Sequence, residues 1–293
     1  MADAGREPGH EPVMVDEVLR FLGGRGTVVD MTVGAGGHAE ALLASGVRRV
    51  LAVDRDPEAL RLARDRLAGY GDRFRSVRAR FSEAPLPPSA DGVLYDLGVS
   101  SMQLERGDRG FSFRRPGPLD MRMGGSDETG TTSAMDLVNT APEIELARIV
   151  SEYGQEHRAR RVAAAIVRAR ARSPLRTTDE LARVVASAVG GRRGGPHPAR
   201  RTFQALRIAV NRELEELAAS LPRVVGILAP GGRIVVIAYH SLEDRIVKRT
   251  FADDERLEVL TRKPLRPGPG EIERNPRARS ARLRAAERMG AAA

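Results

Sequence analysis

The sequence predicts an α/β protein in which a parallel sheet is interrupted by an all-helical insertion. Strand-like and helix-like segments alternate as far as Asp96, which is typical of βαβ units. A glycine- and proline-rich segment then leads into four helical stretches without a credible strand. The most hydrophobic strand of the chain, Arg233–Ala238, follows later, so the sheet resumes. We therefore expect a discontinuous domain at 1–105 and 200–293, with a helical insertion at 106–199.

The first part of the sheet is predicted from short β-branched runs separated by segments of helical periodicity. Pro57 stands at a first-turn position, where proline is favoured. The expected elements are, in order, a helix at Val13–Leu22, a strand at Thr27–Met31, a helix at His38–Ala44, a strand at Arg49–Asp54, a helix at Pro57–Leu67, and strands at Phe74–Ala79 and Gly92–Asp96.

The insertion is predicted to begin in a long loop, residues 107–132, and loops of this length are usually functional or disordered. Helices are expected at Ala134–Asn139, Pro142–Tyr153, Glu156–Arg172 and Thr178–Val189. Thr177, followed by acidic residues, is a typical N-cap for the last of them. A second, basic loop covers Gly190–Pro198.

Beyond the insertion, apolar residues at helical spacing predict one long helix over Arg201–Leu221. Pro230-Gly231-Gly232 predicts a turn before the Arg233–Ala238 strand, and a helix at Leu242–Phe251 follows. Leu257–Thr261 is a candidate edge strand. The tail from Pro264 is rich in proline, glycine and arginine and carries no predicted element.

Composition excludes several classes of chemistry. The chain of 293 residues has no cysteine, which removes disulfides, thiolate metal sites and cysteine nucleophiles. No stretch approaches the roughly 20 apolar residues that cross a bilayer, so we expect a cytoplasmic protein without membrane contact. The net charge is +9, and almost all of the cationic residues are arginines. This composition fits either a polyanionic partner or a GC-rich genome.

A glycine turn follows the first predicted strand. Gly34, Gly36 and Gly37 let the backbone approach a ligand at a helix N-terminus, and Asp54 ends the next strand, where a carboxylate suits a ribose diol. With Ala39 the loop also satisfies a dinucleotide fingerprint, so NAD is one alternative. Asp30, directly before the loop, favours S-adenosylmethionine, because a carboxylate attracts a cationic amine and repels a pyrophosphate.

At the level of longer motifs, the sequence resembles the RsmH (MraW) family, bacterial methyltransferases that act on the exocyclic N4 of a cytidine in small-subunit ribosomal RNA. The match runs from near the N-terminus to the tail. The stretches that carry it are His10-Glu11-Pro12-Val13-Met14, GAGGH at the glycine turn, LAVDRDP ending at Pro57, DLGVSS beginning at Asp96 with Gln103-Leu104, RGFSF beginning at Arg109, GPLDMRM beginning at Gly117, RTFQALR beginning at Arg201, HSLEDRIVKR beginning at His240, and NPRARS beginning at Asn275.

The resemblance implies a class I, Rossmann-like methyltransferase sheet with a helical substrate-recognition insertion. It implies S-adenosylmethionine as cofactor and, as partner, 16S rRNA within the small ribosomal subunit, methylated in its decoding region. The cofactor positions that it maps onto this chain are Gly36, Gly37, His38, Asp54, Phe81, Asp96 and Gln103, to which the glycine turn adds Gly34. Tyr239 stands where relatives often carry phenylalanine. Monomer and homodimer are both compatible with the sequence.

Three residues are candidates for the catalytic step. Asp96 is either the acceptor for an amine proton or a carboxylate that only holds the loop or the cofactor. Ser100 either contacts the target base or forms a turn, and His240 either contacts the base or its phosphate or caps the following helix. Because methylation at C5 of a pyrimidine ordinarily needs a cysteine, the composition favours a nitrogen target.

Several features remain open at this level. Phe111 and Phe113 could stack on a flipped base or anchor a core. The arginines of Glu156–Arg172, and Arg277, Arg279, Arg282 and Arg284 in the tail, suit either a solvated face or RNA phosphates. The histidines show no metal spacing, and no metal site is predicted. A non-catalytic ribosome-assembly factor is a third functional class.

Overall fold

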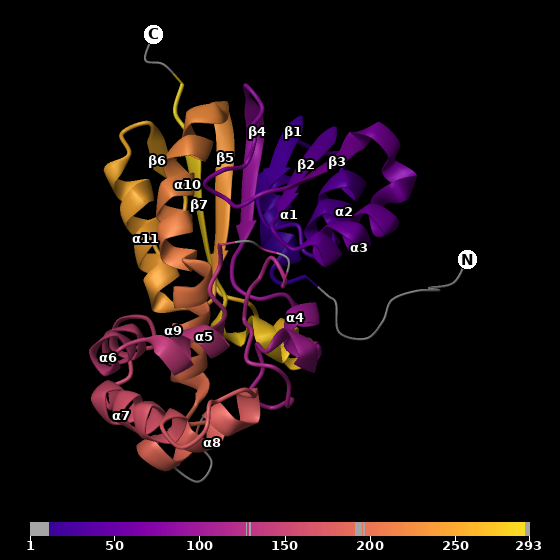
Figure 1. Cartoon of the computed structure of the whole chain (residues 1–293). Coiled ribbons are helices and arrows are strands. Elements are labelled where there is room, and N and C mark those ends of the chain that lie inside the picture. The colour runs from indigo at the N-terminus through magenta and orange to yellow at the C-terminus, as the bar shows by residue number, and fades with distance from the viewer. Residues whose placement is uncertain (1–11, 127, 129, 191–194, 196, 291–293) are drawn as a thin grey trace. The chain divides into compact units, whose positions relative to one another are not determined.

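The computed structural model describes residues 12–126, 128, 130–190, 195 and 197–290. Within it the chain forms two compact units, coloured along the chain in Figure 1. Unit 1 comprises Met1–Gly98 and Leu214–Ala293, and unit 2 comprises Val99–Glu213. His10 and Glu11 of the first family-like stretch, and residues 191–194 and 196 of the predicted Gly190–Pro198 loop, lie outside the described residues.

Unit 1 is built on a mixed seven-stranded sheet in the order β3-β2-β1-β4-β5-β7-β6. All neighbours are parallel except β7, which runs antiparallel between β5 and β6. The parallel order β3-β2-β1-β4-β5, with helices between the strands, is the Rossmann-like arrangement that the resemblance implies. The strands are β1 (Thr27–Asp30), β2 (Arg49–Asp54), β3 (Phe74–Arg78), β4 (Ala90–Asp96), β5 (Leu228–Ala238), β6 (Leu257–Val259) and β7 (Arg282–Arg288).

Helices cover both faces of this sheet because its strands are apolar on both sides. Val28 belongs to one core cluster and its neighbour Val29 to the other, as the alternation of side chains along a strand requires. The first cluster is covered by α1 (Val15–Leu22), α2 (Gly37–Ala44) and α3 (Pro57–Leu67), and the second by α10 (Glu213–Ile227) and α11 (Ser241–Asp253). Shorter elements are η1 (Ala68–Arg73), α12 (Pro269–Arg274) and η3 (Pro276–Ser280).

Unit 2 consists of helices and connecting loops in its described residues, without a named strand, and has its own core. Phe203, Leu206 and Val210 pack there with the apolar faces of the preceding helices. The unit contains α4 (Ser101–Glu105), η2 (Gly107–Arg109), α5 (Ala134–Thr140), α6 (Glu143–Glu152), α7 (Ala159–Arg170), α8 (Thr178–Val189) and α9 (Arg200–Asn211). In the part of the chain that is described, none of the helices is both long and apolar enough to cross a membrane.

The unit boundaries differ from the expected 106–199. Unit 2 extends outward on both sides because the Val99–Leu104 segment and α9 pack into its core. The single helix predicted over Arg201–Leu221 is wrong: Arg212 adopts a left-handed conformation, with φ of 52°, and separates α9 from α10. The apolar residues keep their helical spacing across Arg212, so the sequence pattern does not predict this break.

The tail also differs from expectation. β7 lies within the segment from Pro264 that carried no predicted element, and it occupies an interior position of the sheet. Its sequence, RLRAAER, has few β-branched residues and four charges, which are weak strand signals. The predicted Pro230-Gly231-Gly232 turn lies inside β5, at a register shift opposite Ala90 and Gly92. Gly231 has φ of 75° there.

Candidate active site

Five parallel strands of unit 1, β1 to β5, end at one edge of the sheet, and three of them end in an aspartate. β1 ends at Asp30, β2 at Asp54 and β4 at Asp96, while β5 ends at Ala238. Ligands of open α/β sheets bind outside such carboxyl ends. The fold therefore brings together the three carboxylates that lie far apart in the sequence.

The glycine turn after β1 has the backbone that only glycine adopts readily. Gly34 and Gly36 have φ of 51° and 86°. A Cβ on Gly36 would stand 3.3 Å from Cα of Ala63, so glycine also permits the close approach of α3. A Cβ on Gly34 would meet only open space apart from a carbonyl at 4.0 Å. The turn thus packs tightly on one side and leaves Gly34 accessible on the other.

Asp30 is a buried carboxyl group with spare hydrogen-bonding capacity. Its Oδ1 accepts from the backbone N–H of Thr32 at 3.0 Å. Its Oδ2 has no hydrogen-bond partner among the described residues, although the side chain is 1% exposed. Burial raises the pKa of Asp30 to about 7. Oδ2 thus lacks a donor among the described residues, and a ligand amine would supply one.

Asp54 joins the end of β2 to the glycine turn. Its Oδ2 accepts from the N–H of Gly34 at 3.0 Å, and its Oδ1 accepts from the N–H of Asp56 at 2.9 Å. Burial raises the pKa of Asp54 to about 6, against the opposing effect of these N–H groups. Asp56 in turn caps α3. The carboxylate is consequently fixed beside the open side of the turn.

Asp96 is held by partners from three other segments. The hydroxyl of Tyr239 donates to its Oδ1 at 2.7 Å, and its backbone N–H donates to Oγ1 of Thr32 at 2.6 Å. Nε2 of His38, on α2, lies 3.5 Å from Oδ2. Burial, together with the Asp96 carboxylate, raises the pKa of Tyr239 well above its usual value, so this hydroxyl remains a donor. Asp96 and His38 are therefore neighbours, as a common site requires.

His38 itself is 6% exposed, and neither ring nitrogen makes a hydrogen bond within the described part of the chain. A buried polar ring without a partner is costly unless something else satisfies it. The His38 ring is thus a second polar group without a hydrogen bond at this edge of the sheet, in addition to Oδ2 of Asp30.

The loop that carries Phe81 is held by one face of α10. Oε2 of Glu216 accepts from the backbone N–H and the hydroxyl of Ser82, at 3.2 and 2.8 Å. Arg223 donates to the carbonyls of Phe81 and Ala84, at 3.2 and 3.0 Å. The Phe81 ring packs edge-on against Tyr95, with centroids 5.6 Å apart, and the Tyr95 hydroxyl bonds to Ser220 of α10. These contacts determine where the Phe81 ring lies.

His240 is the N-cap residue of α11. Its Nδ1 accepts from the N–H of Glu243 at 3.4 Å, and Oε2 of Glu243 accepts from the N–H of His240 at 3.2 Å, which makes a capping box. Nε2 lies 3.1 Å from Oε1 of Glu243. Of the two roles considered for His240, these contacts favour the helix cap.

Ser100 and Gln103 belong to unit 2 and form a second capping box. Oγ of Ser100 accepts from the N–H of Gln103, and Oε1 of Gln103 accepts from the N–H of Ser100, both at 3.2 Å. Gln103 is buried. Both side chains thus shape the turn that starts α4, and this favours the turn-forming role of Ser100.

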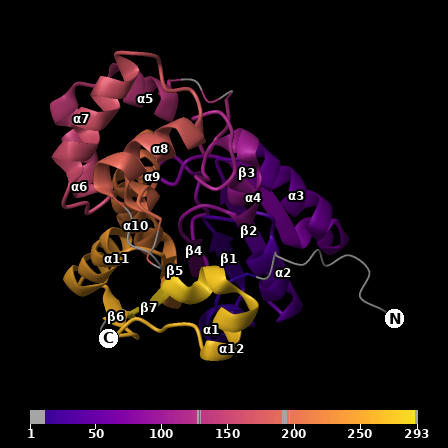
Figure 2. The same cartoon turned by 90° about the horizontal axis from the view of Figure 1, so that it is seen from below.

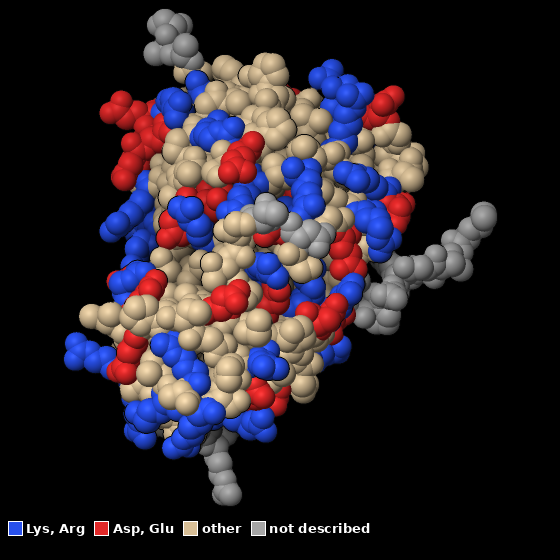
Figure 3. All heavy atoms as spheres, in the orientation of Figure 1, with Lys and Arg blue, Asp and Glu red and all other residues tan. Residues whose placement is uncertain are grey.

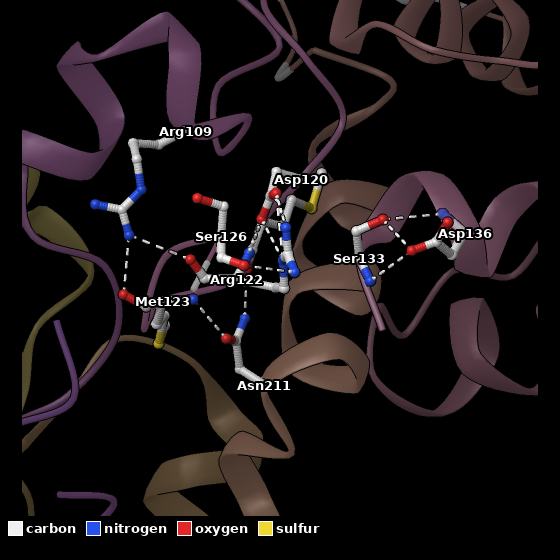
Figure 4. Close-up of polar contacts among 9 residues, drawn as sticks. Arg109, Asp120, Arg122, Met123, Ser126, Ser133, Asp136 and Asn211 are labelled. Carbon is white, nitrogen blue, oxygen red and sulfur yellow. Dashed lines mark hydrogen bonds and ion pairs between the residues drawn. The ribbon is translucent and has the colours of Figure 1, made fainter. Parts of the chain in front are cut away.

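The long loop of unit 2 is tied down by polar contacts, which Figure 4 shows. Asn211 donates to the carbonyl of Met121 at 2.7 Å and accepts from the N–H of Met123 at 2.8 Å. Arg109 donates to the carbonyls of Arg122 and Met123. Met121 has φ of 63°, a conformation that a non-glycine residue adopts only when its surroundings hold it there. The family-like GPLDMRM stretch therefore has a fixed backbone.

Phe111 and Phe113 are core residues of unit 2. Phe111 is 6% exposed, and Phe113 packs edge-on against Phe203 and stacks on His197. Their surroundings support the core-anchor alternative rather than stacking on a base.

Arginines gather on the surface of unit 2 over α7 and α8 (Figure 3). Two of the α7-region arginines serve the fold, since Arg158 donates to the carbonyl of Val189 and Arg170 to that of Val138. Four others, Arg160, Arg161, Arg168 and Arg172, are exposed. None of these four has an ionic or hydrogen-bonded partner among the described residues.

Sequence reasoning missed Thr32, Tyr239, Glu216 and Arg223 as contributors to the site. Tyr239 directly follows β5, and Thr32 lies two residues after the end of β1. Their positions just beyond strand ends could have marked them as residues of the site. No local signal marks Glu216 or Arg223, because their partners lie more than a hundred residues away.

Comparison with known proteins places this geometry in a family. The model of the MraW methylase family matches residues 7–289. A "Ribosomal RNA small subunit methyltransferase H" from Sorangium cellulosum is 50% identical over 292 residues, covering 97% of this chain and 92% of the relative. The protein of the same name from Gloeobacter violaceus is 51% identical over 283 residues, covering 96% and 88%. A solved rRNA methylase from Streptococcus thermophilus overlaps with 99% of this chain and all of that one, at a TM-score of 0.45 and 12% identity.

Proposed function

The chain belongs to the MraW methylase family, and from this premise we propose that it transfers a methyl group from S-adenosylmethionine to the exocyclic N4 of a cytidine in the decoding region of 16S rRNA. The relatives named above as small-subunit rRNA methyltransferases support the substrate class. The observation that carries the chemistry is the position of Asp96, which ends β4 beside His38 and the glycine turn.

The residues at the carboxyl edge fit S-adenosylmethionine. The orphaned Oδ2 of Asp30 suits the ammonium group of the methionyl part, and Asp54 suits the ribose diol. Gly34 leaves open space beside the turn, His38 offers an unsatisfied ring nitrogen, and Phe81 offers an aromatic surface to the adenine. Gly36 and Gly37, which pack against α3 and Pro12, complete the proposed cofactor-binding turn. We include Gln103 and Asp96 among the cofactor-binding residues.

When bound, S-adenosylmethionine supplies an electrophilic methyl carbon whose sulfur retains the electron pair of the broken bond. The cytosine amine is a weak nucleophile because its lone pair is delocalised into the ring. Asp96 accepts a hydrogen bond from that amine and then its proton, directly or through one water. Tyr239 and Thr32 fix Asp96, so the carboxylate needs little reorganisation.

The absence of cysteine from the whole chain supports a nitrogen target over C5, since C5 methylation ordinarily proceeds through a cysteine adduct. In this proposal His240 and Ser100 act at the catalytic step by holding the turns after Tyr239 and Val99 through their capping boxes. Unit 2 recognises the RNA, and the exposed arginines over α7 bind phosphates.

The decisive experiment supplies isotopically labelled methyl donor and small ribosomal subunits from a strain that lacks the enzyme, followed by nucleoside analysis. We expect label in N4-methylcytidine, with free 16S rRNA a poorer substrate than the assembled subunit. The matched control is Asp96→Asn, which keeps the side-chain size.

Two outcomes contradict the proposal. Label in a C5-methylated nucleoside would overturn the nitrogen target. Tight RNA binding without any label, unchanged by Asp54→Ala, would indicate an assembly factor instead.

A further inference from the structure

The net positive charge of unit 1 comes from one segment, the connection between β6 and β7, residues 260–281. This segment holds six Lys and Arg residues and two Glu residues, whereas the rest of unit 1 holds 22 Lys and Arg against 24 Asp and Glu. Without the connection, unit 1 would carry a net negative charge. The six cations are Arg262, Lys263, Arg266, Arg274, Arg277 and Arg279.

Four of these cations are directed to solvent. Arg262, Lys263, Arg266 and Arg279 are exposed, and none has an ionic or hydrogen-bonded partner within the described part of the chain. The first two of the three arginines in β7 behave differently. Arg284 is 6% exposed and pairs with Asp244 at 2.6 Å, and Arg282 lies 3.7 Å from the same carboxylate. The tail arginines thus separate into a structural pair and a solvent-facing group.

The backbone that carries the exposed cations is anchored at several points. Leu265 and Leu283 exchange two backbone hydrogen bonds, of 2.9 and 3.0 Å. Oε1 of Glu271 accepts from the N–H of Met14 at 2.7 Å, and Ala278 is fully buried. Cations on a fixed backbone lose less freedom on binding a partner than cations on a mobile tail do.

The connection lies at the edge of the sheet that holds the site. Leu283, the partner of Leu265, pairs with Ile237 in β5, and the carbonyl of Ile237 accepts from the N–H of Leu97, next to Asp96. Figures 1 and 2 show the connection, in yellow, at the end of the sheet toward which the arrow of β4 points. The connection that carries the cations therefore lies at the same edge of the sheet as Asp96.

We propose that the β6–β7 connection is a second phosphate-binding surface, located on unit 1, for the RNA strand that carries the target base; this inference rests on the proposed function. Arginine predominates, and its planar guanidinium matches phosphate oxygens. The large exposed apolar residues of the described chain, Met135, Ile144 and Met289, all lie outside the connection. A surface of exposed cations without a large exposed apolar side chain fits a nucleic-acid backbone better than a membrane or an apolar protein partner.

The test is the salt dependence of RNA affinity for the full chain, with a 16S rRNA transcript as the probe. The variant replaces Arg262, Lys263, Arg266 and Arg279 with glutamine. We expect the slope of log K against log salt to fall by about 3, since each phosphate contact contributes about 0.7 to 0.9. Affinity near 0.1 M salt should fall by roughly 10- to 100-fold.

The matched control replaces four exposed cations elsewhere on unit 1, Arg49, Arg245, Lys248 and Arg249, with glutamine. It removes the same net charge, so an equal change in slope in both variants would overturn the proposal in favour of a general charge effect. An unchanged slope in the test variant would overturn it as well.

A second measurement separates this inference from the proposed function. The affinity for S-adenosylhomocysteine, measured by calorimetry, should be the same in both variants and the wild type within about twofold, because none of the substituted residues belongs to the cofactor site. Failure of methyl transfer in the wild type would refute the proposed function, whereas the RNA slopes would still decide the phosphate surface. Loss of cofactor affinity in the test variant alone would show that the connection supports the fold, and would overturn the assignment.

Discussion

Unit 1 carries 28 Lys and Arg residues against 26 Asp and Glu, whereas unit 2 carries 20 against 13, so most of the net charge of +9 belongs to the helical unit. In unit 1 the residues of the site are carboxylates that the fold buries, and burial raises the pKa of Asp30 and of Asp54. In unit 2 the charged residues proposed to bind RNA are exposed arginines. Buried groups interact strongly and are little affected by salt, whereas exposed charges act at longer range and are screened. The comparison indicates that cofactor chemistry and RNA affinity respond to different solution conditions.

The largest effect expected on the unit 1 side comes from Asp96→Asn. The variant keeps the contact geometry but cannot take the amine proton, so kcat should fall by roughly 10²- to 10⁴-fold. Single-turnover methyl transfer measures this, and calorimetry with S-adenosylhomocysteine should show a nearly unchanged affinity. Tyr239→Phe, which removes one donor to Asp96, should lose less than about tenfold. A weakened cofactor affinity with normal kcat at saturation would make Asp96 a cofactor ligand only.

The buried carboxyl of Asp30 predicts how the ligand-free protein responds to pH. Its folded pKa of about 7 lies above the ordinary 3.8, so the folded state binds a proton that the unfolded chain has released. The free energy of unfolding should therefore fall as pH rises from about 4 to 7, by roughly 2 to 4 kcal/mol.

Urea denaturation of Asp30→Asn at pH 5 and pH 8 checks this prediction. In the variant, the free energy of unfolding should fall much less between these two pH values than in the wild type. The remaining decrease comes from Asp54, whose pKa is raised to about 6. A wild-type protein that is more stable at pH 8 than at pH 5 would contradict the assignment.

The arginines over α7 test the other side of the comparison. Replacing Arg160, Arg161, Arg168 and Arg172 with glutamine should weaken RNA binding by roughly 10-fold at 0.1 M salt and reduce the salt slope by about 3. Filter binding at several salt concentrations measures both. The affinity for S-adenosylhomocysteine should not change. A loss of RNA affinity that persists at high salt would point to a folding defect in unit 2.

The smallest effect is expected from Arg223→Ala, which frees one side of the loop that carries Phe81. We expect about a three- to tenfold loss of affinity for S-adenosylhomocysteine, as for one or two hydrogen bonds. In a protein that already carries Phe81→Ala, Arg223→Ala should cause no further loss of affinity for S-adenosylhomocysteine, because Arg223 acts through the Phe81 ring. Arg249→Ala, at an exposed position of α11, is the control. Equal losses with and without Phe81 would refute the coupling.

The sequence was sufficient for features that depend on local pattern. Apolar runs predicted β1, β2 and β4, and the structure contains all three strands. The glycine turn and Asp54, both singled out from the sequence, lie together, since Oδ2 of Asp54 accepts from the N–H of Gly34. It was insufficient where the determining contacts are distant. Tyr239 and Asp96 are 143 residues apart, and β7 is a strand because β5 and β6 flank it rather than because of its own composition. The break at Arg212 changes one φ angle and leaves the apolar stripe intact.

The interior position of β7 has a consequence for the order in which the protein folds. Among the described strands β7 comes last in sequence, yet it is the strand that pairs with β6 and that completes the free side of β5. During synthesis, unit 2 can form its local helix pairs early, while the sheet keeps an open edge until the final strand emerges. A chaperone that shields strand edges would accordingly find its binding site on nascent β5, and deletion of β7 would leave that site permanently exposed.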